Sequence, residues 1–244
     1  MTYNHTHLNQ FIDSLNNFNE QQEFGKSPKE FLEKILNNLT NPSIRLIELS
    51  GILPNRKLSR SSVFSIVNDE NLSICYKIIS ILSWGDMRYG NAYKFFRNWD
   101  EYSPNLEVLL GLFYEENISR LWLYDQLNKM KMKGCGISYI PKFIYFFSNG
   151  NAYIMDQWTA KSIELIWENK YRIGIKITNN YLPRDNHSGI YEEFCKRVEF
   201  LTKYINDTLG THLNASQLEE RLFSNGANNG QVRGVWRNYV INNW

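Results

Sequence analysis

The sequence has few cysteines, little net charge and no long apolar run. Its three cysteines, Cys75, Cys135 and Cys195, are widely spaced and include no C-x-x-C pair. This odd set indicates neither a disulfide framework nor a zinc site, so we expect a reducing, cytoplasmic setting. No window approaches about 18 uninterrupted apolar residues, and the first residues lack a basic patch before an apolar stretch, so neither a membrane span nor a secretion signal is predicted.

The composition nevertheless indicates a globular protein. The chain has 244 residues, of which 43% are hydrophobic and 15% aromatic, so it can bury a sizeable core. We therefore expect a single folded domain over 1–244. The formal charge of +2 is too small to indicate a nucleic-acid partner by itself, although a near-neutral total can hide a basic groove. His5 and His7 are the only close pair of histidines, on an end that we expect to be frayed, and we predict neither a metal site nor a cofactor.

Helical patterns dominate the chain. Ser27 as N-cap, Pro28 at the first helical position and Glu30 three residues after the cap predict a helix that begins at Pro28. Further helical segments are predicted at 71–84, 91–99, 104–116, 117–132, 156–168, 190–209, 215–223 and 231–241. The fold class is therefore predominantly α-helical.

Only one segment alternates apolar and polar residues as a strand does. This segment, "YRIGIKIT" at 171–178, is isolated, and one strand does not make a sheet. The polar segment 176–189, which holds Pro183 and Gly189, is predicted to be a surface loop before the C-terminal helices.

A glycine turn between two helices gives the first indication of function. In "KMKGCGIS" we expect Lys129, Lys131 and Lys133 in the last turn of one helix and Ser138 as the N-cap of the next. Gly134 and Gly136 permit positive φ and a close approach of the backbone to another group. Free N–H groups beside lysines could hold a nucleic-acid phosphate, and the alternative is an ordinary helical hairpin.

Lys142 lies among aromatic residues in "SYIPKFIYFF", one turn after Ser138. A desolvated lysine holds more free amine, which is a nucleophile that forms Schiff bases. The alternative is a lysine whose stem follows an apolar surface and whose amine reaches water.

Asp156 directly precedes the helix predicted from "DQWTAKSIELIWE". An aspartate at this place can simply be an N-cap. A carboxylate there can also stabilise the oxocarbenium-like state through which a glycosidic bond breaks. Lys142 and Asp156 together are thus a candidate catalytic pair.

These residues resemble the helix-hairpin-helix DNA glycosylases, specifically the 8-oxoguanine glycosylase fold. The family pattern has two glycines one residue apart, a catalytic lysine, and a segment that ends in a catalytic aspartate opening the next helix. Here "KGCGIS", Lys142 and "YIMD" ending at Asp156 match it. The likeness is closer still to bacterial proteins of this fold, some encoded in antiphage clusters such as type IV CBASS, and covers roughly Ile79 to Val240.

The resemblance implies two helical lobes around a central cleft. It also implies an N-terminal helical lobe over 1–70, a glycosylase-like core over 71–170 and C-terminal helices over 187–244. One departure concerns the lysine, which in the best known members comes two residues after the second glycine. Ser138 occupies that position here, and Lys142 follows four residues later, which is one helical turn and therefore the same helix face.

The resemblance also implies roles for further residues. A modified guanine would be flipped out of the duplex, and Lys142 would attack the anomeric carbon while Asp156 stabilises the sugar cation. Candidates for the base pocket or the strand gap are Trp84, Arg88, Tyr89, Trp158 and Trp236, although each tryptophan can instead be a core residue. Lys133, Gly134, Gly136 and Ser138 would form the phosphate-binding hairpin.

Three functions therefore stay open at the level of the sequence. The first is a DNA glycosylase or lyase acting on an oxidised or modified guanine. The second is a non-catalytic sensor of a modified base, nucleotide or nucleic acid, with defence-system proteins as partners. The third is a helical interaction module whose cleft is vestigial. Covalent trapping with borohydride would separate the first from the others.

Overall fold

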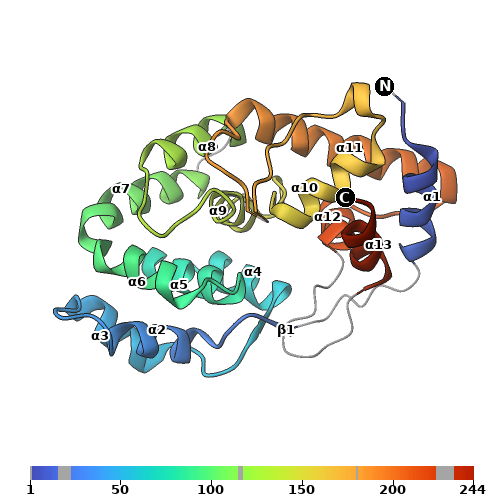
Figure 1. Ribbon diagram of the computed structural model, residues 1–244. Coiled ribbons are helices and arrows are strands. Elements are labelled where there is room, and N and C mark those ends of the chain that lie inside the picture. Colours follow the sequence, from blue (N-terminus) through green and yellow to red (C-terminus); the bar gives the residue numbers. More distant parts are fainter. Residues whose placement is uncertain (1, 16–22, 115–117, 180, 224–233) are drawn as a thin grey trace. The chain divides into compact units, whose positions relative to one another are not determined.

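The computed structural model describes residues 2–15, 23–114, 118–179, 181–223 and 234–244 (Figure 1). The chain divides into two compact units. The central unit is Gln21–Gly150, and the terminal unit joins Met1–Glu20 to Asn151–Trp244. The described residues are predominantly helical, which confirms the predicted fold class. The single domain over 1–244, with its segments 1–70, 71–170 and 187–244, stays a prediction.

The central unit is built around two helices that are buried on nearly all sides. All eight residues of α9 are buried, as are ten of the eleven residues of α5. Apolar residues all round a helix are typical of a helix enclosed by others, and here α4 packs on both α5 and α9. The elements of this unit are β1 (Glu23–Phe24), α2 (Pro28–Leu36), α3 (Ile44–Ile52), β2 (Leu58–Ser59), α4 (Arg60–Asn68), α5 (Ile74–Trp84), α6 (Tyr89–Arg97), α7 (Trp99–Gly111), η2 (Leu112–Tyr114), α8 (Arg120–Lys129) and α9 (Ile140–Phe147).

The structure of the central unit confirms one predicted helix start and differs from the sequence-based expectation in two other features. The predicted helix start at Ser27 is confirmed, because the Ser27 hydroxyl accepts a hydrogen bond from the N–H of Glu30 at 3.1 Å. The helix predicted from Pro104 instead begins at Trp99 and contains the proline. Asp100 and Glu101 lie in its first turn, where carboxylates complement the helix dipole. β1 and β2, which the sequence did not indicate, pair antiparallel over two residues each.

The terminal unit is organised around α10 (Gln157–Ile166), which packs against the other α-helices of the unit. These other elements are α1 (His5–Ser14), η3 (Asn169–Tyr171), α11 (Ser188–Leu209), α12 (Ala215–Phe223) and α13 (Val235–Asn243). Figure 1 shows α1 beside α13, although they are the first and last helices of the chain. Phe11 of α1 packs edge-on against Trp236 of α13, with ring centroids 5.0 Å apart.

Residues 4–14 form a capped helix held by the rest of the unit, whereas we expected a frayed end. The Asn4 side chain caps α1, and the Asn4 N–H donates to the carbonyl of Ile166 at 2.8 Å. His7, one of the two neighbouring histidines, makes a 2.8 Å hydrogen bond between its Nδ1 and the Tyr239 hydroxyl. The sequence missed this helix because its stability comes from tertiary packing of few apolar residues.

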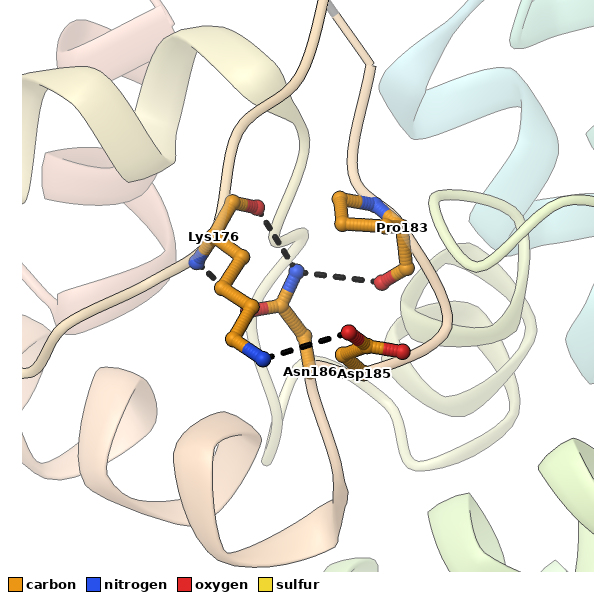
Figure 2. A network of polar contacts seen from close by, with 4 residues as sticks. All are labelled: Lys176, Pro183, Asp185 and Asn186. Atoms are coloured by element: carbon orange, nitrogen blue, oxygen red, sulfur yellow. Dashed lines mark hydrogen bonds and ion pairs between the residues drawn. The ribbon is translucent and has the colours of Figure 1, made fainter.

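The strand predicted at 171–178 is wrong. Tyr171 belongs to η3, and 172–177 is extended chain outside any strand, after which Thr178 forms an isolated bridge with Tyr181. Side chains bind the backbone of the extended chain. Glu164 Oε1 accepts the N–H of Ile175 at 2.7 Å. Figure 2 shows the Asn186 side chain accepting from the N–H of Lys176 and donating to the carbonyls of Lys176 and Pro183. The predicted loop that follows is confirmed, but Asn186 at its end is completely buried.

Candidate functional site

The hairpin between α8 and α9 differs in detail from the expected helix, turn and helix. Only Lys129 lies in the last turn of α8, because that helix ends there, and Lys131 and Lys133 follow it. Lys133 is exposed, its N–H donates to the Tyr102 hydroxyl at 3.0 Å, and its Nζ lies 3.5 Å from Asn98 Oδ1. Of these lysines, Lys133 is thus fixed by both its backbone and its side chain.

The two hairpin glycines have different roles. Gly134 has a φ of +78°, and a Cβ there would lie 2.0 Å from the carbonyl oxygen of Asn91 in α6. Only glycine allows this backbone conformation at so close an approach. Gly136 is exposed, and a Cβ there would meet no atom within 4 Å. Gly134 therefore packs the hairpin onto α6, and Gly136 is the glycine that is accessible.

Ser138 is not the N-cap of α9, contrary to our prediction. The cap is Tyr139, whose side chain makes no capping hydrogen bond, and Pro141 lies in the first turn as expected. The backbone carbonyl of Ser138 accepts a hydrogen bond from Lys142 Nζ at 3.1 Å. Ser138 thus contacts the lysine one turn later through its backbone rather than capping the helix.

Lys142 is buried, with 8% of its surface exposed. Its aliphatic stem lies against Gly85 at the end of α5, where a Cβ would come within 2.9 Å of the Lys142 Cδ. Its Nζ lies 5.3 Å from the centre of the Tyr139 ring. The lysine stem therefore occupies the space beside Gly85 that a side chain there would fill. The amine contacts the Tyr139 ring and donates a hydrogen bond to the Ser138 carbonyl.

Tyr139 connects Lys142 to the loop after α5. Burial, with the Cys135 thiol and the Asp86 carboxylate nearby, raises the pKa of Tyr139, and Arg88 opposes this rise by its charge and by a backbone hydrogen bond. The Tyr139 hydroxyl therefore stays protonated at neutral pH. Asp86 forms an ion pair with Lys26 and has a φ of 52°, a conformation uncommon for residues other than glycine.

Sequence reasoning placed Tyr139 beside Lys142 but missed Gly85, which contacts the lysine stem, and Asp86, which lies near Tyr139 and pairs with Lys26. Gly85 and Asp86 lie in "SWGDMRYGN" at 83–91, between the base-pocket candidates Trp84 and Arg88. The structure brings this stretch and the hairpin together within the central unit, through Gly85 against Lys142 and Asn91 against Gly134. A glycine and an acidic residue directly after a buried helix were the only available signal.

The three candidates for the base pocket in the central unit have different surroundings. Trp84 is 8% exposed and packs edge-on against Phe146, with ring centroids 5.0 Å apart. Arg88 is exposed at the start of α6. Tyr89 is half-buried, with Lys34 Nζ 4.3 Å from its ring centre. Trp84 is a core residue by its packing, whereas Arg88 and Tyr89 are accessible.

Asp156 caps α10, as the sequence predicted. Its Oδ1 accepts the N–H groups of Trp158 at 2.7 Å and Thr159 at 3.0 Å, and the Thr159 hydroxyl accepts the Asp156 N–H in return. Both backbone bonds use Oδ1, so Oδ2 is the oxygen that can face another group. The N-terminal end of the helix dipole stabilises a negative charge at this place.

The two tryptophans of the terminal unit are also placed. Trp158 is half-buried, with the guanidinium of Arg237 4.0 Å and Lys161 Nζ 5.0 Å from its ring centre. Burial, and then the charge of Arg237, lowers the pKa of Lys161. Trp236 is 2% exposed, and its indole N–H donates to Ser162 Oγ at 2.8 Å. Trp236 is therefore a core residue, and Trp158 is part of a cationic, aromatic cluster.

Lys142 belongs to the central unit and Asp156 to the terminal unit. Each is described in its own unit, so their pairing stays a prediction. Across the described part of the chain, no three histidine, cysteine, aspartate or glutamate side chains gather as a metal ion would need. In the same residues, no helix has the length and apolar character to cross a membrane.

Comparison with known proteins identifies the family. A family model described as "Putative 8-oxoguanine DNA glycosylase OGG-like protein" matches residues 21–223. No curated protein and no solved structure matches the chain. The matched range covers most of the 244 residues and includes the hairpin, Lys142 and Asp156. The resemblance predicted from the sequence is confirmed, and this chain belongs to the OGG-like family of 8-oxoguanine DNA glycosylase-like proteins.

Proposed function

We propose that this protein is a DNA glycosylase with lyase activity that removes an oxidised or otherwise modified guanine, using Lys142 as the nucleophile. The observation that carries this proposal is the setting of Lys142: a buried amine directly after the glycine hairpin, in a chain of the OGG-like family. The hydrogen bond to Ser138 and the stem contact with Gly85 hold the amine in one place. Fixed position is the main requirement of a nucleophile that attacks a bound substrate.

In the proposed reaction the neutral amine of Lys142 attacks C1′ of the damaged nucleotide. The bond between C1′ and the base breaks, and the base leaves with one proton of the amine. The C1′–O4′ bond then breaks, O4′ takes the second amine proton, and the lysine remains joined to the ring-opened sugar as a Schiff base. Loss of a C2′ proton then expels the 3′ phosphate by β-elimination and cuts the strand. Asp156 is proposed to stabilise the positive charge that develops on the sugar, through the oxygen Oδ2 that capping leaves unused.

The hairpin is proposed to bind the DNA backbone. Lys133 and Gly136 are both exposed, and the Lys133 backbone is fixed by its bond to Tyr102. Ser138 lies half-buried beside them. Lys133→Gln is expected to weaken binding to all duplexes about equally and to reduce the salt dependence of affinity by about one phosphate contact. Gly134 packs the hairpin closely against α6 and so helps to hold these residues in place.

Covalent trapping tests the proposed chemistry. The full-length protein is incubated with a duplex that holds an abasic site, or 8-oxoguanine opposite each of the four bases, and borohydride reduces any Schiff base to a stable adduct. We expect an adduct with at least one duplex, its loss in Lys142→Gln, and slower release of the base in Asp156→Asn. Lys161→Gln is a matched control, because Lys161 is 7% exposed and Lys142 8%.

Two results would contradict the proposal. An adduct that survives Lys142→Gln but disappears in Lys161→Gln would move the nucleophile to the terminal unit. Absence of any adduct, with DNA binding retained, would favour the second candidate, a non-catalytic sensor of a modified base or nucleotide. The displacement of the lysine by one turn, with Ser138 at the usual position, favours that candidate.

The setting of the activity is also a proposal. The three cysteines are free and buried, which is consistent with the proposed cytoplasmic setting. A role in antiphage defence, with defence-system proteins as partners, rests on the resemblance alone, and the genes adjacent to this one would test it.

A further inference from the structure

A cavity of about 380 Å³ lies between α2 and α6 in the central unit. Its lining residues are Lys34, Ile35, Asn38, Tyr89, Gly90 and Tyr93. Ligand sites in proteins begin at roughly 300 Å³, so the cavity is large enough for one small molecule. Lys142 is not among its lining residues.

The cavity combines aromatic walls with positive charge. Tyr89 and Tyr93 are both half-buried, so part of each side chain stays accessible. Lys34 Nζ lies 4.3 Å and Lys26 Nζ 5.1 Å from the centre of the Tyr89 ring. Lys26 is neutralised by Asp86, whereas Lys34 lies on the wall itself. A planar ring with an attached anion matches these groups, because rings stack on tyrosine and lysine binds phosphate.

Polar groups in the cavity can also read the edge of a ring. Asn38 donates its Nδ2 hydrogen to the Lys34 carbonyl at 2.7 Å, so Oδ1 is its acceptor for a ligand. Burial, with Glu30 and Asp86 nearby, raises the pKa of Tyr89. The Tyr89 hydroxyl is therefore a hydrogen-bond donor over the whole physiological range. An acceptor and a donor beside aromatic walls suit the hydrogen-bonding edge of a nucleobase.

We propose that this cavity binds one nucleotide, with its base against Tyr89 or Tyr93 and its phosphate at Lys34. The nucleotide can be a free mononucleotide or an unpaired nucleotide of a DNA strand, since both present the same base and phosphate. Tyr89 is also a candidate for the base pocket or the strand gap, but the inference goes beyond the proposed function, because it needs neither Lys142 nor cleavage of a glycosidic bond.

Gly90 offers a test that adds bulk without removing a contact. It lines the cavity, and a Cβ at this position would meet no atom within 4 Å. Gly90→Leu would occupy the cavity, and it replaces a helical glycine by a residue of higher helix propensity, so the fold is retained. Gly51→Leu is the matched control, because Gly51 is also a helical glycine with open space and lies outside the cavity.

The probes are 2-aminopurine deoxynucleoside monophosphate and a single-stranded oligonucleotide with one internal 2-aminopurine, whose fluorescence reports stacking. We expect at least one probe to bind the wild type and Gly51→Leu alike, with at least tenfold weaker binding to Gly90→Leu. Tyr93→Leu should weaken binding by about fivefold or more if the base stacks on it, since base–aromatic stacking contributes to the binding of unpaired bases. Binding of the free probe identifies a mononucleotide site, and binding of the oligonucleotide alone identifies a strand nucleotide.

Two outcomes would overturn the inference: neither probe binds the wild type, or Gly90→Leu binds both probes as the wild type does. Lys142→Gln separates this failure from that of the proposed function. It should bind the probes normally while it forms no trapped adduct. Loss of the adduct with intact probe binding therefore concerns the role of Lys142 alone. Loss of probe binding with an intact adduct concerns the cavity alone.

Discussion

The central and terminal units share side-chain caps but differ in the contacts that fix some of their irregular segments. In the central unit, backbones approach each other where glycine leaves room: a Cβ on Gly25 would lie 2.1 Å from the Ser83 carbonyl oxygen, and one on Gly134 would lie 2.0 Å from that of Asn91. In the terminal unit, side-chain oxygens of Asp156, Glu164 and Asn186 bind backbone N–H groups.

The difference predicts which substitutions each unit tolerates. A glycine contact fails when any side chain is added, because the neighbouring backbone cannot rotate away. A side-chain contact fails when the oxygen is removed, and a shape-matched amide or carboxylate can replace it. The proposed nucleophile, Lys142, lies in the central unit, where close backbone contacts at glycine set the position of neighbouring segments.

The largest effect is expected at the hairpin glycine that touches α6. Gly134→Ala forces a side chain into a positive φ and against the Asn91 carbonyl, which should reduce the free energy of unfolding by at least about 3 kcal/mol. This corresponds to a melting temperature lower by about 6–12 °C. Gly136→Ala is the control and should stay within about 0.5 kcal/mol of the wild type. Equal losses in urea unfolding would show that both glycines are needed for packing.

The next effect concerns the position of Lys142 rather than stability. Gly85→Ala places a Cβ within 2.9 Å of the Lys142 Cδ, and the flexible stem is the part that must move. We expect a folded protein whose rate of borohydride-trapped adduct formation falls by about 10- to 100-fold, because a misplaced nucleophile reacts slowly. Gly51→Ala, in an open helical site, should keep the wild-type rate. A wild-type rate in Gly85→Ala would mean that this contact does not position the amine.

In the terminal unit the clearest comparison is between two adjacent loop residues. Asn186→Ala removes three hydrogen bonds to the backbone of Lys176 and Pro183, and should destabilise the fold by about 2 kcal/mol. Asp185→Ala removes only the 3.1 Å ion pair with Lys176, whose side chains are 66% and 62% exposed, and should change stability by less than about 0.5 kcal/mol. Urea unfolding measures both changes in the free energy of unfolding. A loss in Asp185→Ala as large as that in Asn186→Ala would mean that the ion pair stabilises the loop as much as the three hydrogen bonds do.

Helices with strong local signals were predictable from the sequence. The bounds of α12 match the predicted 215–223, and the caps of α2 and α10 were identified as Ser27 and Asp156. Cap residues and apolar periodicity act within one or two turns, so a sequence displays them directly. The weakly patterned helices α1, α3 and α4 were missed, because their stability depends on packing between distant segments.

The candidate site was predictable only in part, for the same reason. The burial of Lys142 followed from its apolar neighbours in the sequence, and the structure confirms it. Its contact with Gly85 joins residues 57 positions apart (142 − 85), which no local pattern can indicate. The N-cap at Ser138 was wrong by one residue, because 137–139 form a turn and α9 is capped by Tyr139. Local rules thus identified the proposed nucleophile but not Gly85, which its stem contacts.

The smallest effect is expected at Glu164, and it depends on pH. Burial raises the pKa of this carboxyl above the ordinary value of 4.5, against the opposing hydrogen bond from Ile175 and the charge of Arg172. Just above pH 4.5 the native state therefore keeps a proton that the unfolded chain has released, so stability falls as pH rises through the raised pKa.

Glu164→Gln keeps an acceptor for the Ile175 N–H and removes the titration of this carboxyl. We expect its stability in urea to match or exceed that of the wild type at pH 7, with the difference shrinking towards pH 4. The control Glu168→Gln removes a carboxylate that is 39% exposed and paired with Lys170, and should change the stability at pH 7 by less than about 0.5 kcal/mol. A wild type and a Glu164→Gln variant whose stabilities stay parallel over this range would mean that the native carboxyl titrates as it does in the unfolded chain, and that the Ile175 bond offsets its burial in full.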